Sequence, residues 1–155
     1  MEPKKMPQAT VKTLIRAEVG KVYEAFVKPE MLSRFWLNAV SGPLEVGKTV
    51  TWEFMVAGIV DQVTALELIP NQKIKIAFSD STTAEWRFDV IDSVYTVVSV
   101  VNTGFSGSLD EQMEQALNSV EGFTWVLADL KTLLELGKSA GIVKDKAWLI
   151  EKSMQ

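Results

Sequence analysis

The chain contains no cysteine and no histidine among its 155 residues. Without cysteine it forms no disulfide and has no thiolate nucleophile. Without histidine it lacks the usual zinc ligands and the base of a Ser-His-Asp mechanism. Any catalysis must therefore use carboxylates, lysine, arginine, tyrosine or an ordered water. We expect neither a metal nor a cofactor.

Long apolar runs and clusters of basic residues are missing as well. No stretch approaches the roughly 20 apolar residues of a membrane span, and Lys4 and Lys5 are not followed by the apolar segment of a signal peptide. The 16 basic residues are scattered and the net charge is −4, which argues against nucleic-acid binding. We expect a cytoplasmic protein with no membrane span and no nucleic-acid partner.

The length and composition fit one globular domain. The chain has 47% hydrophobic and 23% charged residues, and it shows no internal repeat, linker or low-complexity segment. We therefore expect a single domain over residues 1–155. Its core should cover about 10–137, and a short extra helix should follow at about 142–152.

The spacing of apolar residues changes along the chain. Residues 10–18 alternate between apolar and polar, which predicts a first strand. Residues 21–27 carry apolar side chains at helical spacing, and Pro29 ends that helix and opens a second short one through Trp36. Strand patterns then return in segments separated by turn residues, most of them alternating and the last one β-branched and nearly continuous. These segments are 49–56, 59–69, 74–78, 84–90 and 94–102. Strands without helices between them predict an antiparallel meander.

Helical spacing returns in the last third of the chain. Ser108 and Glu111 form a capping-box pattern that predicts a short helix, and Asn118 with Glu121 resembles a second helix start. Apolar residues recur at spacings of three and four over 119–137, which predicts a long amphipathic helix.

These elements together predict an α+β helix-grip fold. A curved antiparallel sheet of about six or seven strands has one apolar face, and only the long helix can cover it. The two short helices after the first strand should close one end. The space enclosed by sheet and helices is the expected ligand cavity.

Six segments carry a resemblance to a known family. They are 22–26 followed by 29–32 and 35–36, Gly42 with 46–47 and Trp52, 66–68 before Pro70, 74–78, 102–105, and 122–123 with Leu127, Leu130 and Leu134. In this order, over about residues 10–136, the chain resembles the START-like (SRPBCC, helix-grip) superfamily. Within it, the chain is similar to the family named after the activator of heat-shock-protein-90 ATPase. Phe35 and Phe123 stand where that family usually has tryptophan.

The resemblance implies a binding function more than a catalytic one. Relatives on this fold include lipid carriers, hormone receptors and aromatase/cyclase enzymes, and this branch has no invariant catalytic motif to carry over. We predict non-catalytic binding or transport of a small hydrophobic or aromatic ligand in the internal cavity.

Eight residues are candidates for ligand binding. They are Trp36, Trp52, Phe54, Trp86, Phe88, Phe105, Phe123 and Leu127. The four on strands lie at inward-facing positions. Packing in the core is the simpler explanation for each of them alone, and as a set they favour the wall of a cavity. For Gly122, in the predicted long helix, we favour a close approach of helix and sheet, and a gap that admits ligand is the alternative.

Two other functions stay open. Asp61 or Gln62 must point inward, and an inward carboxylate would suit a cyclase- or hydrolase-type enzyme that uses a buried acid and water. Most other acidic residues lie at strand positions that should face outward, toward solvent. Glu85 and Arg87 should form a surface ion pair. The other alternative is a chaperone or stress-response interaction module with an exposed apolar patch.

The C-terminal segment has an apolar edge formed by Ala147, Trp148 and Ile150. Docking on the chain's own surface explains this edge, and a homodimer contact is the alternative.

Overall fold

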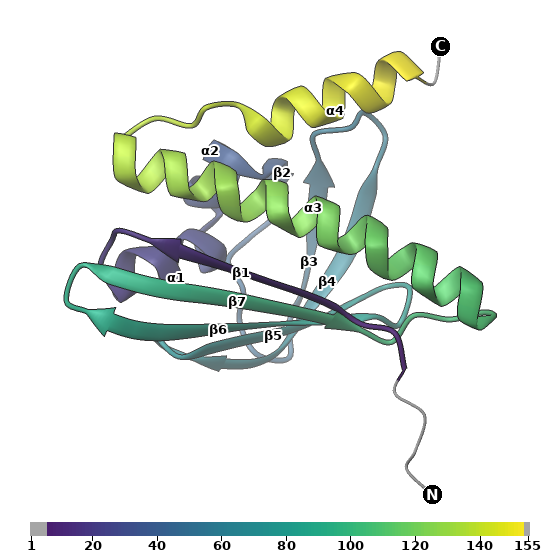
Figure 1. Ribbon diagram of the computed structural model, residues 1–155, viewed down its shortest axis with the longest axis horizontal. Coiled ribbons are helices and arrows are strands. Elements are labelled where there is room, and N and C mark those ends of the chain that lie inside the picture. Colours follow the sequence, from purple (N-terminus) through teal and green to yellow (C-terminus); the bar gives the residue numbers. More distant parts are fainter. Residues whose placement is uncertain (1–5, 154–155) are drawn as a thin grey trace, which may run out of the picture.

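A seven-stranded sheet curves around one long helix in this computed structural model, which describes residues 6–153 (Figure 1). The strands are β1 (Ala9–Ile15), β2 (Leu37–Val40), β3 (Thr49–Phe54), β4 (Val60–Ile69), β5 (Lys73–Phe78), β6 (Thr83–Asp92) and β7 (Tyr95–Thr103). Their order in the sheet is β1-β7-β6-β5-β4-β3-β2, and each neighbouring pair is antiparallel. The predicted meander and helix-grip fold are confirmed.

The described residues form four helices beside the sheet. They are α1 (Val19–Val27), α2 (Pro29–Phe35), α3 (Leu109–Leu136) and α4 (Ile142–Ser153). Helix α3 crosses the concave face, α1 and α2 lie at one end of the sheet, and α4 returns beside α3 toward the β3–β4 hairpin (Figure 1). Among residues 6–153, no helix combines the length and the apolar character needed to cross a bilayer.

The core lies between the concave face of the sheet and α3. Strand residues alternate between buried and more exposed, as the two-residue period of a strand requires. Trp86 on β6, for example, lies opposite Val100 on β7 and Ile74 on β5, and all three are almost fully buried. From the helix, Leu127 and Leu130 complete this apolar layer.

The structure differs from the sequence prediction in two elements. Strand β2 was not predicted, because it has only four residues and only Leu37 is buried, so no alternation is visible. The predicted helix break at Asn118 is wrong, since α3 runs without interruption for 28 residues. Its capping box at Ser108 and Glu111 forms as expected. An interior asparagine costs under about 1 kcal/mol relative to alanine, too little to end a helix that packs on a sheet.

Candidate functional site: an aromatic-lined cavity

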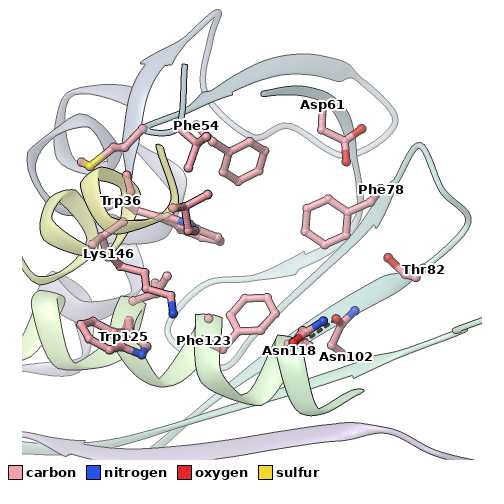
Figure 2. A pocket seen from close by; sticks show the side chains of 18 of the residues that line it. Trp36, Phe54, Asp61, Phe78, Thr82, Asn102, Asn118, Phe123, Trp125 and Lys146 are labelled. Atoms are coloured by element: carbon pink, nitrogen blue, oxygen red, sulfur yellow. Dashed lines mark hydrogen bonds between the residues drawn. The ribbon is translucent and has the colours of Figure 1, made fainter. Parts of the chain in front are cut away.

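A cavity of about 460 Å³ lies between α3, α4 and the part of the sheet formed by β3, β4 and β5. Its walls are mainly apolar, and most of the polar side chains lie on one side, opposite Lys146 (Figure 2). This volume falls in the range of small-molecule sites. The cavity is therefore the candidate functional site.

Five aromatic side chains form much of the cavity wall. They are Trp36, Phe54, Phe78, Phe123 and Trp125. Their places follow from the local structure: Phe54 and Phe78 end strands β3 and β5, Trp36 follows α2, and the last two lie on α3. The Trp36 ring packs edge-on against Phe123, with 6.0 Å between the ring centroids.

Two aspartates lie on the sheet side of the cavity. Asp61 on β4 lies directly opposite Trp52, and its Oδ1 accepts hydrogen bonds from the backbone N–H groups of Gln62 at 2.7 Å and Ser79 at 3.3 Å. Asp80, in the turn after β5, accepts from both the backbone N–H and the hydroxyl of Thr82 through its own Oδ1. Both carboxylates are held by backbone donors and border the cavity.

Asn102 joins three elements at the floor of the cavity. It is 6% exposed, its Nδ2 donates to the carbonyl of Thr83 at 2.8 Å, and its Oδ1 accepts from the hydroxyl of Ser119 at 2.7 Å. The side chain thereby links β7 to β6 and to α3. Asn118 lies beside it in Figure 2.

Helix α4 supplies one wall of the cavity through Val143, Lys146, Ala147 and Ile150. The Lys146 ammonium contacts the Glu121 carboxylate and lies 5.5 Å from the centroid of the Trp125 ring. Farther along α4, Glu151 accepts a hydrogen bond from the backbone N–H of Ala57 at 2.8 Å. Helix α4 thus docks on the chain's own surface, although Trp148 is still 56% exposed.

The structure divides the eight predicted binding residues into two groups. Trp36, Phe54 and Phe123 line the cavity. The other five do not line it. Trp52, Trp86 and Leu127 are almost fully buried in the core, Phe88 packs edge-on against Tyr23 at 5.6 Å, and Phe105 is half-buried in the loop before α3.

Several residues of the cavity wall were missed. The parity of Phe78, which follows Ile74 and Ile76 at period two, could have identified it as inward-facing. Trp125 had no such signal, because its place depends on where α4 docks. Asp61 was one of two inward candidates, and the structure places its carboxylate toward the cavity (Figure 2).

Gly122 borders the cavity, and a Cβ atom built at this position would meet no atom within 4 Å. A close approach of helix and sheet therefore does not explain this glycine. The position instead leaves room in the cavity, which was the alternative interpretation of this glycine.

The remaining titratable groups lie elsewhere. Burial raises the pKa of Tyr23, whose ring packs in the core. Glu85 and Arg87 form the expected surface ion pair at 2.9 Å on the outer face of the sheet. Among residues 6–153, no group of three or more carboxylates is arranged to hold a metal ion.

Comparisons with known proteins agree with this architecture. A family model described as activator of Hsp90 ATPase homolog 1-like protein matches residues 16–135. The solved structure of protein SSP2350 from Staphylococcus saprophyticus is 26% identical with a TM-score of 0.74, and the match covers 85% of this chain and 94% of that one. No curated protein matches the chain.

Two further solved structures share the fold. The Aha1 dimer from Colwellia psychrerythraea is 21% identical with a TM-score of 0.76, and the match covers 86% of this chain and 100% of that one. DynU16, a protein of the dynemicin biosynthetic locus, is 17% identical with a TM-score of 0.73, covering 87% of this chain and 49% of that one. Helix α4 begins after the last residue of the family match.

Proposed function

We propose a ligand-binding function for this chain, which belongs to the family of activator of Hsp90 ATPase homolog 1-like proteins. The ligand is a small, largely apolar or aromatic molecule, and the cavity between α3, α4 and the sheet holds it. The observation that carries the proposal is the aromatic wall of that cavity.

The size and chemistry of the cavity support this proposal. Its volume of about 460 Å³ is close to that of sites for small organic molecules, and its walls are mainly apolar with a few polar groups on one side. The polar groups are held in place by hydrogen bonds, as the Asn102 side chain is by Thr83 and Ser119. A site of this kind orients a ligand with little reorganisation.

A thermal-shift screen with aromatic and aliphatic compounds tests the proposal, because a ligand that binds only the folded state raises the melting temperature. Trp36 and Trp125 line the cavity, so titrations can be followed by tryptophan fluorescence. Each compound that raises the melting temperature should bind with one molecule per chain. A library in which no compound shifts the melting temperature would count against ligand binding.

Gly122 offers a matched pair of variants for locating the site. Gly122→Ala adds one carbon where there is open space, so we expect ligand binding to be retained. Gly122→Phe fills the cavity and should abolish binding. Glu114→Phe, on an exposed part of α3 away from the cavity, controls for adding a ring to this helix. Equal binding by the Gly122→Phe and Glu114→Phe proteins would place the ligand elsewhere.

A second candidate function is an enzyme of the cyclase or hydrolase kind. It is favoured by Asp61, an inward carboxylate whose strand neighbour is the buried Trp52. Asp61 would act as a general base on a water molecule. Turnover of a bound compound by the wild type, lost in Asp61→Asn with binding retained, would establish this function. Binding without any product would exclude it for that compound.

Other predictions concern location and partners. Cytoplasmic location and a role in the stress response stay predictions. An interaction module would use the exposed row of Leu109, Met113 and Leu117, which are four residues apart on α3. Since a family structure from Colwellia psychrerythraea is described as a dimer, a homodimer stays an alternative that size-exclusion chromatography with light scattering would test.

A further inference from the structure

We propose that the cavity selects organic cations: apolar or aromatic molecules that carry a protonated amine or a similar positive group. This inference rests on the proposed function, because it names the chemical class of the ligand for the same cavity. It is drawn from the charges that border the cavity, the hydrogen bonds those charges already make, and the rings between them.

Three charged side chains line the cavity, and only the negative ones lack a counter-charge. The Lys146 ammonium contacts the Glu121 carboxylate, so its charge is balanced. Within the described part of the chain, neither Asp61 nor Asp80 forms an ion pair. The cavity therefore presents uncompensated negative charge on its sheet side. Asp80 is exposed, whereas Asp61 is partly buried next to apolar walls that weaken solvent screening.

Each of these carboxylates has one oxygen left for a ligand. The hydrogen bonds to Asp61 and Asp80 all reach their Oδ1 atoms, and no donor among residues 6–153 contacts either Oδ2. Asp61 is only partly exposed and faces the interior of the cavity (Figure 2). A carboxylate oxygen in this setting favours a charged N–H donor, which gives the shorter and stronger kind of hydrogen bond.

The aromatic walls suit a cation as well. Positive groups are attracted to the faces of indole and phenyl rings. The chain already provides an example, since the Lys146 ammonium lies 5.5 Å from the centroid of the Trp125 ring. Figure 2 shows Lys146 and Asp61 on opposite sides of the space, with aromatic rings between them. A ligand can therefore place its cation near Asp61 and keep its apolar body on the rings.

An anionic ligand fits the same site poorly. Its negative group would have to share the Lys146 ammonium with the Glu121 carboxylate or lie near the two aspartates. Like charges at short range in a partly buried site are unfavourable. The net charge of −4 adds a longer-range attraction for cations that salt will weaken.

The test compares three probes with the same aromatic body: 2-naphthylmethylammonium, the neutral 2-naphthylmethanol and the anionic 2-naphthoate. Affinities are measured at neutral pH by calorimetry and tryptophan fluorescence. We expect the cation to bind about tenfold more tightly than the neutral probe, the size of one good charge-assisted interaction, and the anion to bind most weakly. An equal or higher affinity for the neutral or anionic probe overturns the cation proposal and leaves ligand binding intact.

Two variants with opposite expected effects test the role of the charges. Asp61→Asn keeps the shape of the side chain and removes its charge. It should therefore weaken the binding of the cationic probe about tenfold and leave the binding of the neutral probe nearly unchanged. Lys146→Gln leaves the Glu121 carboxylate without its counter-charge and should strengthen the binding of the cationic probe. Asp89→Asn, an exposed aspartate on β6 outside the cavity, changes the net charge equally and controls for long-range attraction.

The outcomes separate the two proposals. Loss of cation preference in Asp61→Asn, but not in Asp89→Asn, supports the inference. Unchanged preference in Asp61→Asn, or a lower preference for the cation over the neutral probe in Lys146→Gln, overturns it even if all the probes bind. If none of the three probes binds the wild type, aromatic ligand binding fails, and the cation proposal fails with it.

Discussion

Asp129, which is 1% exposed in α3, accepts a hydrogen bond at 3.0 Å from the backbone N–H of Val143 at the start of α4. Its other carboxylate oxygen accepts from the hydroxyl of Ser139 in the connecting loop. The first N–H groups of a helix have no partner within the helix, and a negative charge at that end is favourable. One buried side chain of α3 therefore caps α4 and holds it over the cavity.

We predict that Asp129→Asn lowers the free energy of unfolding by about 2 kcal/mol, because the amide cannot accept at both positions and carries no charge. Urea unfolding at neutral pH measures the change. Asp145→Asn is the control, since Asp145 is an exposed acid in the first turn of the same helix. It should cost no more than about 0.5 kcal/mol. Equal losses for the two variants would show that Asp129 acts only through its charge near the helix end.

Gly122→Ala should make the protein more stable. Gly122 lies inside α3, a new Cβ atom meets nothing within 4 Å, and glycine in a helix interior is less favourable than alanine by about 0.5–1 kcal/mol. The expected gain in the free energy of unfolding is of that size. A stabilised variant would show that stability does not favour glycine at this position. A loss of stability would mean that the helix cannot hold a side chain here.

Much of the sheet could be predicted because its signal is local. Strands β5 and β6 alternate with period two, so their inward side chains follow directly from the sequence. Strand β7 is rich in β-branched residues on both faces, so its sequence predicts a strand and not which side chains face inward. The capping box at Ser108 and Glu111 is local in the same way. Strand β2 gave no signal, since it is a short edge strand with a single buried residue.

The walls of the cavity depend on contacts between distant residues. Helix α4 is placed by Asp129 with Val143 and by Glu121 with Lys146, pairs that lie 14 and 25 residues apart. Neither pairing follows from periodicity. The alternation of a strand could therefore identify Trp52 and Trp86 as facing inward. It could not tell whether an inward residue fills the core or borders the cavity, and it does not apply to Trp125, which borders the cavity from a helix.

The stability contributed by Glu135 should disappear in acid. Burial raises the pKa of Glu135, but the backbone N–H of Arg16 at 2.9 Å and the Lys131 ammonium at 2.6 Å outweigh that effect and hold the pKa below its ordinary value. A lowered pKa in the folded state gives stability that is present above the unfolded value, about 4.3 for glutamate, and is lost as the pH falls through the folded value.

The comparison with Glu135→Gln tests this pH dependence. At pH 7 the variant should be less stable by about 1 kcal/mol, because it loses the charge that Arg16 and Lys131 contact. The difference should shrink as the pH falls below about 4.3, where the wild-type carboxylate also becomes protonated. Urea unfolding between pH 7 and pH 3 measures both proteins. A difference that stays constant over this range would show that charge is not the cause.

Asn102 and Ser119 should behave as an energetically coupled pair. Asn102 is buried and bonds both Ser119 and the carbonyl of Thr83, so Asn102→Ala leaves that carbonyl without this donor and should cost about 2 kcal/mol. Ser119→Ala removes one hydrogen bond and should cost about 1 kcal/mol. In the double variant the shared bond is lost only once, so the total should fall short of the sum by about 1 kcal/mol.

A second cycle provides the control for this coupling. Ser33→Ala removes a hydroxyl that bonds the carbonyl of Pro29 on α2 and shares no hydrogen bond with Asn102. Its effect should add to that of Asn102→Ala within about 0.5 kcal/mol. Free energies from urea unfolding of all six proteins, including the wild type, give both coupling values. Equal coupling in the two cycles would mean that Asn102 acts by filling space between β7 and α3, and that its bond to Ser119 contributes nothing specific.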